Sequence, residues 1–280
     1  MKRIAILMTV FNRKKTTLQC LNSLKKLKLP NGYSYEVFLT NDGCTDGTPE
    51  AVKSGFPEVR IINGDGSLFW NRGMRAAWEE AAKDDFDYYL WLNDDVIVYP
   101  GLFEVLMNCS EQLGNKAIIC GPVEDSAHTC MTYGGEMKWK KFIAPDGTLK
   151  KIDYSQGNIV LIPRFAFKKV GFNDSYYRHS KGDSDYGLMA GKIGVPYYQT
   201  PCYLGSCELH LELGKCYNPS FCLRDRWKAF NRPNGSPLNE TWYYWKKHRG
   251  YFYAFYESFK TLVRVLIPQI WTKSGHATLQ

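Results

Sequence analysis

Apolar runs alternate with amphipathic stretches along the N-terminal third of the chain. The apolar runs lie at residues 4–10, 36–40, 59–62 and 88–92, and stretches with helical spacing lie between them at 16–27, 48–53 and 73–83. Short apolar runs predict buried strands, and strands that alternate with helices predict right-handed crossovers and a mostly parallel sheet. Ligands of such sheets bind beyond the carboxyl ends of the strands. The polar loops after these four strands are therefore the expected site.

The pattern changes after residue 100. A helix is expected to about residue 113, followed by hairpins around Gly134, Gly135 and the turn 145–147. Residues 158–163 read as a further strand and 183–192 as a helix. We therefore predict an α/β fold whose first half is parallel and whose second half is mixed.

Aromatic and basic residues dominate the chain from residue 224 onward. Residues 246–280 hold six Lys or Arg and a single acid, Glu257. Such a segment can lie flat at a membrane surface, with aromatic rings at headgroup depth and cations facing anionic lipids. The alternative is a helical extension that packs on its own domain or on a second subunit.

Composition and charge narrow the class of protein. With 44% hydrophobic and 23% charged residues, the 280-residue chain is neither disordered nor collagen-like. A net charge of +8 suits anionic partners such as phosphates or lipid headgroups, and no nucleic-acid motif accompanies it. We expect an intracellular protein, because the N-terminus lacks signal-peptide features and nine cysteines is an odd number for a disulfide framework.

Adjacent acidic residues follow the fourth apolar run. Asn93-Asp94-Asp95 would emerge at the carboxyl edge of the sheet, where the two carboxylates could hold a divalent cation. Mg²⁺ and Mn²⁺ prefer such oxygen ligands and commonly bind a substrate diphosphate as well. The same three residues would also make an ordinary turn.

Two further loops give this motif its context. Residues 9–12 read Thr-Val-Phe-Asn after the first strand, and residues 40–48 read Thr-Asn-Asp-Gly-Cys-Thr-Asp-Gly-Thr after the second. Together with Asn93-Asp94-Asp95, this order and spacing resembles the inverting family 2 glycosyltransferases of the GT-A fold, over about residues 4–215. Asn41, Cys44 and Asn93 depart from the family pattern.

The resemblance implies a nucleotide-sugar site. Asp42 would accept a hydrogen bond from the imide N–H of a pyrimidine base, Asp94 would meet the ribose, and Asp95 would ligate the metal. For Asp42 and Asp46 the alternative is an Asx turn that caps the next helix; we favour base binding for Asp42 and the turn for Asp46. The residues assigned to the donor are Thr9, Phe11, Asn12, Asp42, Arg72 and Asp94.

The catalytic base is expected at the start of the helix 183–192. Residues 181–188 resemble the Glu-Asp-x-Asp element of the family, which aligns Asp183 with the base that deprotonates the acceptor hydroxyl. Gly182 stands where the family has Glu. The alternative is that Asp183 only caps the helix. Asp185 is assigned to acceptor binding or to support of the helix.

Three further residues are assigned to the metal and to the acceptor side. His210 lies where several family members place a metal-ligating histidine, although a lone histidine is often structural. His179 and Trp70 are placed on the acceptor side. The metal would be Mn²⁺ or Mg²⁺.

The function implied is a metal-dependent, inverting transfer of a hexose or deoxyhexose from a UDP- or dTDP-sugar to a hydroxyl. The loop 68–70 and residues 186–188 also resemble bacterial galactofuranosyl- and rhamnosyltransferases of surface polysaccharides such as lipopolysaccharide or capsule. Their acceptor would be a lipid-linked glycan at the inner face of the membrane. The alternative is a catalytically silent nucleotide-sugar-binding subunit. The expected domains are 1–223, with halves 1–98 and 99–223, and an extension 224–280.

Overall fold

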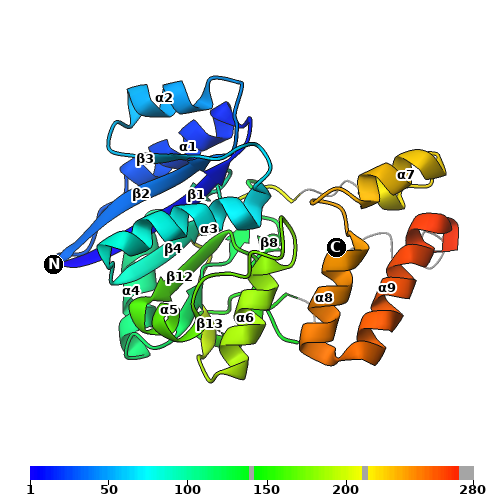
Figure 1. Cartoon of the computed structure of the whole chain (residues 1–280). Coiled ribbons are helices and arrows are strands. Elements are labelled where there is room, and N and C mark those ends of the chain that lie inside the picture. Colours follow the sequence, from blue (N-terminus) through cyan, green and yellow to red (C-terminus); the bar gives the residue numbers. More distant parts are fainter. Residues whose placement is uncertain (139–141, 210–213, 271–280) are drawn as a thin grey trace. The chain divides into compact units, whose positions relative to one another are not determined.

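The computed structural model describes residues 1–138, 142–209 and 214–270, and the chain divides into two compact units. The first, here called the sheet unit, comprises Met1–Ser175 and Gly182–Leu209. The second, the helical unit, comprises Tyr176–Lys181 and His210–Gln280 (Figure 1). The domain boundaries expected from the sequence stay predictions.

An eight-stranded sheet forms the centre of the sheet unit. Its strands, in spatial order, are β10 (Lys150–Ile152), β13 (Tyr197–Gln199), β6 (Ile118–Cys120), β12 (Ile159–Pro163), β4 (Tyr88–Leu92), β1 (Lys2–Val10), β2 (Tyr33–Asn41) and β3 (Arg60–Asn63). Strands β4, β1, β2 and β3 are mutually parallel, whereas β12 runs antiparallel to both β4 and β6. The predicted parallel first half and mixed second half are confirmed.

Helices cover both faces of this sheet. Because side chains alternate along a strand, Ile4, Ile6 and Met8 of β1 face one core and Ala5 and Leu7 face the other. The first core receives α1 (Lys14–Lys25), α2 (Thr48–Gly55) and α4 (Leu102–Gln112), and the second receives α3 (Phe69–Ala81), α5 (Arg164–Val170) and α6 (Gly182–Lys192). This arrangement leaves the carboxyl ends of β1, β2, β3 and β4 at one edge.

Short strands complete the mixed half. They form a four-stranded sheet of β5 (Ile97–Val98), β14 (Gly205–Ser206), β7 (Val123–Glu124) and β8 (Met131–Tyr133), and a pair of β9 (Gly135–Glu136) with β11 (Tyr154–Ser155). Strands β7 and β8 form a hairpin whose connection lies at residues 125–130, ahead of the expected position at Gly134 and Gly135. Gly147 takes a left-handed conformation in the expected turn, but β10, which follows it, pairs with β13 and, among the described residues, forms no hairpin with the segment before the turn. The short 3₁₀ helix η1 (Ala82–Asp84) follows α3.

The helical unit contains η2 (Lys215–Tyr217), α7 (Leu223–Phe230), α8 (Leu238–Arg249) and α9 (Tyr251–Leu266). Helices α8 and α9 run side by side, joined at Gly250 in a left-handed conformation (Figure 1). Segment 176–181 belongs to this unit because Arg178 binds the buried carboxylate of Glu240 at 2.7 Å. Among the described residues, none of the helices combines the length and apolar character that a membrane span needs.

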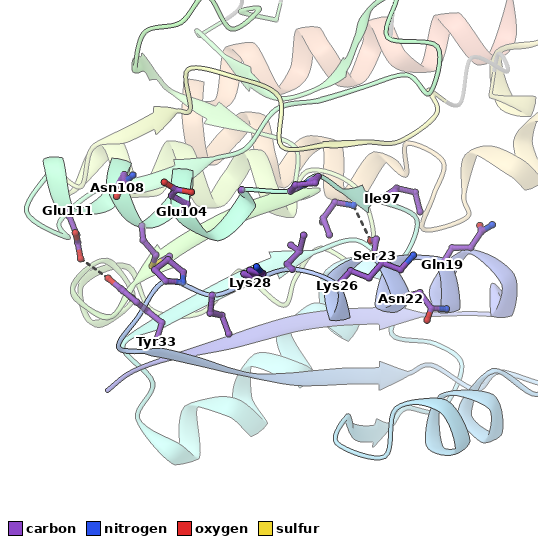
Figure 2. A pocket seen from close by; sticks show the side chains of 17 residues that line it. Gln19, Asn22, Ser23, Lys26, Lys28, Tyr33, Ile97, Glu104, Asn108 and Glu111 are labelled. Atoms are coloured by element: carbon purple, nitrogen blue, oxygen red, sulfur yellow. Dashed lines mark hydrogen bonds between the residues drawn. The ribbon is translucent and has the colours of Figure 1, made fainter.

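A cleft of about 1060 Å³ opens on the α1 and α4 side of the sheet unit (Figure 2). It is mixed in character, with Lys26 and Glu104 in its wall and a hydrogen bond of 2.7 Å from Tyr33 to Glu111. None of the site residues predicted from the sequence lines this cleft.

Candidate active site

The loops after β1 and β2 are tied together by side-chain hydrogen bonds. Asn12 takes a left-handed conformation, with φ of 52°, and its Oδ1 accepts the Thr45 N–H at 2.7 Å. The Asn12 N–H in turn donates to Cys44 Sγ at 3.2 Å. Asn41 and Cys44, two departures from the family pattern, are joined by a hydrogen bond of 2.9 Å from the Cys44 N–H to Asn41 Oδ1. The substituted residues therefore hold the loop in shape.

Asp46 has the geometry of a turn residue. Its Oδ1 accepts the Thr48 N–H at 3.1 Å, the pattern of an Asx turn at the start of α2. Its Oδ2 accepts the Lys14 N–H at 2.9 Å and so satisfies a donor in the first turn of α1. One carboxylate thus supports the N-termini of two helices.

Asp42 is 3% exposed and organises the loop before α3. Its Oδ1 accepts N–H groups from Gly66 at 2.9 Å and Leu68 at 3.2 Å, and its Oδ2 accepts the Phe69 N–H at 2.8 Å. Phe69 is held with a φ of 56°, unusual for a residue other than glycine. Both oxygens are thus engaged with backbone, and the pairing of Asp42 with a base stays a prediction.

Thr9 lies against the first turns of α3. A Cβ on Gly73 would come within 2.2 Å of Thr9 Oγ1, so the helix approaches β1 only because residue 73 is glycine. Thr40 Oγ1 donates to the Gly73 carbonyl at 2.8 Å from the neighbouring strand. Thr9 itself is 9% exposed.

A guanidinium group bridges the two carboxylates after β4. Arg13 Nη1 lies 2.7 Å from Asp95 Oδ2 and 3.2 Å from Asp94 Oδ1, and Thr17 Oγ1 donates to Asp94 Oδ2 at 3.1 Å. Burial raises the pKa of Asp94 to about 6, and the charge of Arg13 partly opposes this rise. The sequence reasoning missed Arg13, although a basic residue directly after the polar loop 9–12 was a signal for it.

Cys207, directly after β14, approaches the same carboxylates. Its Sγ lies 3.5 Å from Asp95 Oδ1, and burial raises the pKa of this thiol far above its ordinary value. Cys207 is therefore a neutral donor beside Asp95. His210, three residues farther along the chain, lies outside the described residues.

Trp70 links the end of β4 to the start of α6. Its indole N–H donates to Asn93 Oδ1 at 2.7 Å, and its ring packs on Gly157, where an added Cβ would come within 2.2 Å of the ring. The Gly157 N–H donates to Asp183 Oδ2 at 3.2 Å. These contacts place Asn93, Trp70 and Asp183 in one connected cluster at the carboxyl edge of the sheet.

Asp183 occupies the first turn of α6. Its Oδ1 accepts the Ser184 N–H at 2.7 Å, and burial raises the pKa of this carboxyl to about 6 despite the N–H donors. An added Cβ on Gly182 would lie 1.9 Å from Asn71 Oδ1. The glycine in place of the family's Glu is therefore required by Asn71, whose Oδ1 also accepts the Asn173 amide at 2.6 Å.

The other predicted residues are distributed more widely. Phe11 is 54% exposed, Asp185 is 2% exposed, and Arg72 Nε donates to the Ser175 carbonyl at 2.9 Å. His179 belongs to the helical unit. Within residues 1–138, 142–209 and 214–270, no three His, Cys, Asp or Glu side chains form a group that could hold a metal ion.

A divalent metal nonetheless fits the pair Asp94 and Asp95. The two carboxylates already share a cation, the guanidinium of Arg13, so their arrangement suits positive charge. Mg²⁺ and Mn²⁺ are typically bound by one or two carboxylates together with substrate phosphates rather than by a full protein cage. The oxygen pair is sufficient for that mode of binding.

Comparison with known proteins assigns the chain to a family. Residues 5–171, more than half of the chain, match the family model of glycosyl transferase family 2. A search of the curated proteins finds no match. The matched span contains Asp42, Arg13 and the pair Asp94 and Asp95, and it ends before Asp183. The chain therefore belongs to glycosyl transferase family 2, and its α/β sheet unit has the GT-A fold of that family.

Proposed function

We propose that the protein transfers a hexose or deoxyhexose from a UDP- or dTDP-sugar to a hydroxyl of a growing, lipid-linked surface glycan, with inversion at the anomeric carbon. Membership of glycosyl transferase family 2 supports glycosyltransferase activity in general. The observation that carries the proposal is the cation-bridged pair Asp94 and Asp95, joined through Asn93, Trp70 and Gly157 to Asp183. The galactofuranosyl or rhamnosyl subtype stays a prediction.

The donor would bind at the loops after β1, β2 and β3. In this proposal Asp42 and Thr9 contact the base, and Asp94 contacts the ribose. The fixed loop 66–69, held by the Asp42 carboxylate, would bring the N-terminus of α3 toward the donor. Helix N-termini favour anionic groups such as a diphosphate. Phe11, Asn12 and Arg72 are proposed as further donor contacts.

Asp95 is the residue that would hold Mn²⁺ or Mg²⁺, with the carboxylate of Asp94 beside it. When bound, the metal would offset the charge that develops on the departing diphosphate. His210 is proposed as a further ligand.

Asp183 is proposed as the catalytic base. The carboxylate would take the proton of the acceptor hydroxyl as that oxygen bonds to the anomeric carbon. The bond from the anomeric carbon to the diphosphate breaks at the same time, and the nucleoside diphosphate leaves with the electron pair. Because burial raises the pKa of Asp183 to about 6, its carboxylate is a stronger base than an exposed aspartate and is still ionised at neutral pH. Trp70, Asp185 and His179 are proposed on the acceptor side.

Arg13 is proposed as a positioning residue that neutralises the carboxylates before the metal and donor arrive. Arg13→Gln removes this competing charge, so Mn²⁺ should bind about tenfold more tightly in the absence of donor, equivalent to about 1.4 kcal/mol. Titration of Mn²⁺ by electron paramagnetic resonance at alkaline pH, where Asp94 is ionised, measures the change. Arg13→Lys, which keeps the charge, is the control and should bind Mn²⁺ as the wild type does. Equal affinity in all three proteins would contradict this role.

The test of the function is a donor panel. Purified protein is incubated with UDP-, dTDP- and GDP-sugars, with and without Mn²⁺, and nucleoside diphosphate release and thermal stabilisation are recorded. Metal-dependent release with a UDP- or dTDP-sugar is the expected result. Stabilisation without release, even with saccharide or lipid-linked acceptors present, would favour the silent binding subunit. No response to any donor would refute the nucleotide-sugar assignment.

A further inference from the structure

Helix α9 exposes a row of aromatic side chains along one face. Phe252 is 85% exposed, Phe255 64%, Tyr256 51% and Phe259 58%. These residues are spaced three, four and seven apart and therefore share one side of the helix. The rings of Phe255 and Phe259 stack with centroids 6.3 Å apart. We call these four residues the α9 aromatic face.

The opposite side of α9 is anchored inside the helical unit. Ala254 and Val265 are fully buried, and Val265 packs with Phe230 of α7. The buried Arg226 side chain donates from Nε to the Val265 carbonyl at 3.0 Å and from Nη2 to the Leu266 carbonyl at 3.3 Å. A cation on these carbonyls also complements the negative end of the helix. The α9 aromatic face thus belongs to a helix with fixed packing rather than to a fraying end.

Cations and amphipathic rings surround the α9 aromatic face. Lys246 lies over the ring of Tyr251 at 4.8 Å and Lys260 over Tyr256 at 5.2 Å. Arg249, at the end of α8, lies 4.3 Å from the ring of Tyr253. Residues 246–270 hold five Lys or Arg and one acid, Glu257, so the net charge around the face is positive.

We infer that the α9 aromatic face docks on an anionic phospholipid bilayer. Aromatic rings with neighbouring Lys and Arg fit the interface, where rings reside at headgroup depth and cations meet anionic lipids. An amphipathic helix binds there in the plane of the membrane with its apolar side inserted. A second copy of the chain is a poorer occupant, because a two-fold contact places the same cations against each other. The inference rests on the proposed function only for its biological setting, since a lipid-linked acceptor would lie at such a bilayer.

Vesicle sedimentation with the full chain tests this surface. The protein should sediment with vesicles that contain phosphatidylglycerol, bind neutral phosphatidylcholine vesicles more weakly, and lose part of its binding at about 0.5 M salt. The triple variant Phe252→Ser, Phe255→Ser, Phe259→Ser should bind at least about tenfold more weakly, since each substitution removes buried apolar area. Phe165→Ser with Ile193→Ser, exposed apolar residues of the sheet unit, is the matched control and should bind normally.

Charge-removing variants test how far the cations near the α9 aromatic face contribute to vesicle binding. Lys246→Gln with Arg249→Gln should weaken binding to the anionic vesicles and leave binding to neutral vesicles unchanged. Lys53→Gln with Lys168→Gln, which removes two exposed cations of the sheet unit, should change neither.

Three results would overturn the inference. They are absence of vesicle binding, equal binding by the triple serine variant, and a dimer in light scattering that this variant dissociates while vesicles remain unbound. Donor turnover is measured separately without vesicles. Vesicle binding without any turnover would refute the proposed function and leave the docking surface standing. Turnover without vesicle binding would refute the docking surface and leave the proposed function standing.

Discussion

Asp183→Asn should lower kcat by about 10³-fold at saturating donor, acceptor and Mn²⁺, because positioned general bases contribute 10²- to 10⁴-fold. The amide retains an oxygen that can accept the Ser184 N–H, now 2.7 Å from the carboxylate, so α6 should keep its N-terminus. Donor affinity, measured by calorimetry, should remain within about twofold of the wild type, since binding needs no base. The variant thus separates an enzyme from a binding subunit.

The pH dependence of kcat tests the role of Asp183 independently. Because the pKa of Asp183 is raised to about 6, the wild-type kcat should fall as pH drops below about 6, when the base is protonated, and level off above it. This acid limb should be shallower in the residual turnover of Asp183→Asn, where Asp94, whose pKa is also raised to about 6, still titrates. Asp225→Asn is the matched control, since Asp225 lies in the first turn of α7 as Asp183 does in α6. A normal kcat in Asp183→Asn would show that Asp183 only caps the helix.

Asp95→Asn should weaken Mn²⁺ binding by at least about tenfold and lower turnover by about 10²-fold at a fixed Mn²⁺ concentration. An amide oxygen carries no net charge and is a poorer ligand for a hard cation than a carboxylate oxygen. Paramagnetic resonance of bound Mn²⁺ and nucleoside diphosphate release measure the two effects separately.

The control for this variant is another carboxylate that pairs with arginine. On the surface, Asp84 Oδ2 pairs with Arg60 Nη1 at a distance of 2.6 Å. Asp84→Asn should leave Mn²⁺ binding and turnover unchanged. Excess Mn²⁺ should restore part of the turnover of Asp95→Asn. Full activity without added metal in both variants would show that the transfer does not use the pair Asp94 and Asp95.

The elements that position the site were predictable because each is a local pattern. The runs at residues 4–10 and 88–92 are strands β1 and β4, and the helix expected at 183–192 is α6 at Gly182–Lys192. Hydrophobic period and turn residues are properties of neighbouring positions, so the sequence carries them directly. The polar loops at the strand ends follow from the parallel order.

The contacts inside the site could not be predicted because they join distant positions. Arg13 meets Asp94 and Asp95 across more than eighty residues of chain, and the Trp70 N–H reaches Asn93. A basic residue in a loop could pair with any of many acidic residues, and the sequence alone does not say which of them the fold brings close. Asp42 illustrates the same limit, since its three N–H donors are contributed by a loop that follows the next strand.

The chain leaves the sheet unit at residue 176 for an equally nonlocal reason. Tyr176 stacks on Tyr243 of α8 with ring centroids 4.0 Å apart, and Arg178 binds Glu240. Nothing in the local sequence of 176–181 distinguishes it from the flanking loops of the sheet unit. Its membership of the helical unit depends on partners more than sixty residues later.

The contact of Gly182 with Asn71 limits which substitutions the chain can accept at either position. Since a Cβ at residue 182 would lie 1.9 Å from Asn71 Oδ1, a substitution that introduces Glu at 182 requires the Asn71 side chain to move or to be replaced by a smaller one. Replacing Asn71 removes one of the two acceptors of the buried Asn173 amide, since only the Asn71 backbone carbonyl remains, and is costly alone. The two positions are therefore epistatic, and libraries that alter the acceptor side of the site should randomise them jointly.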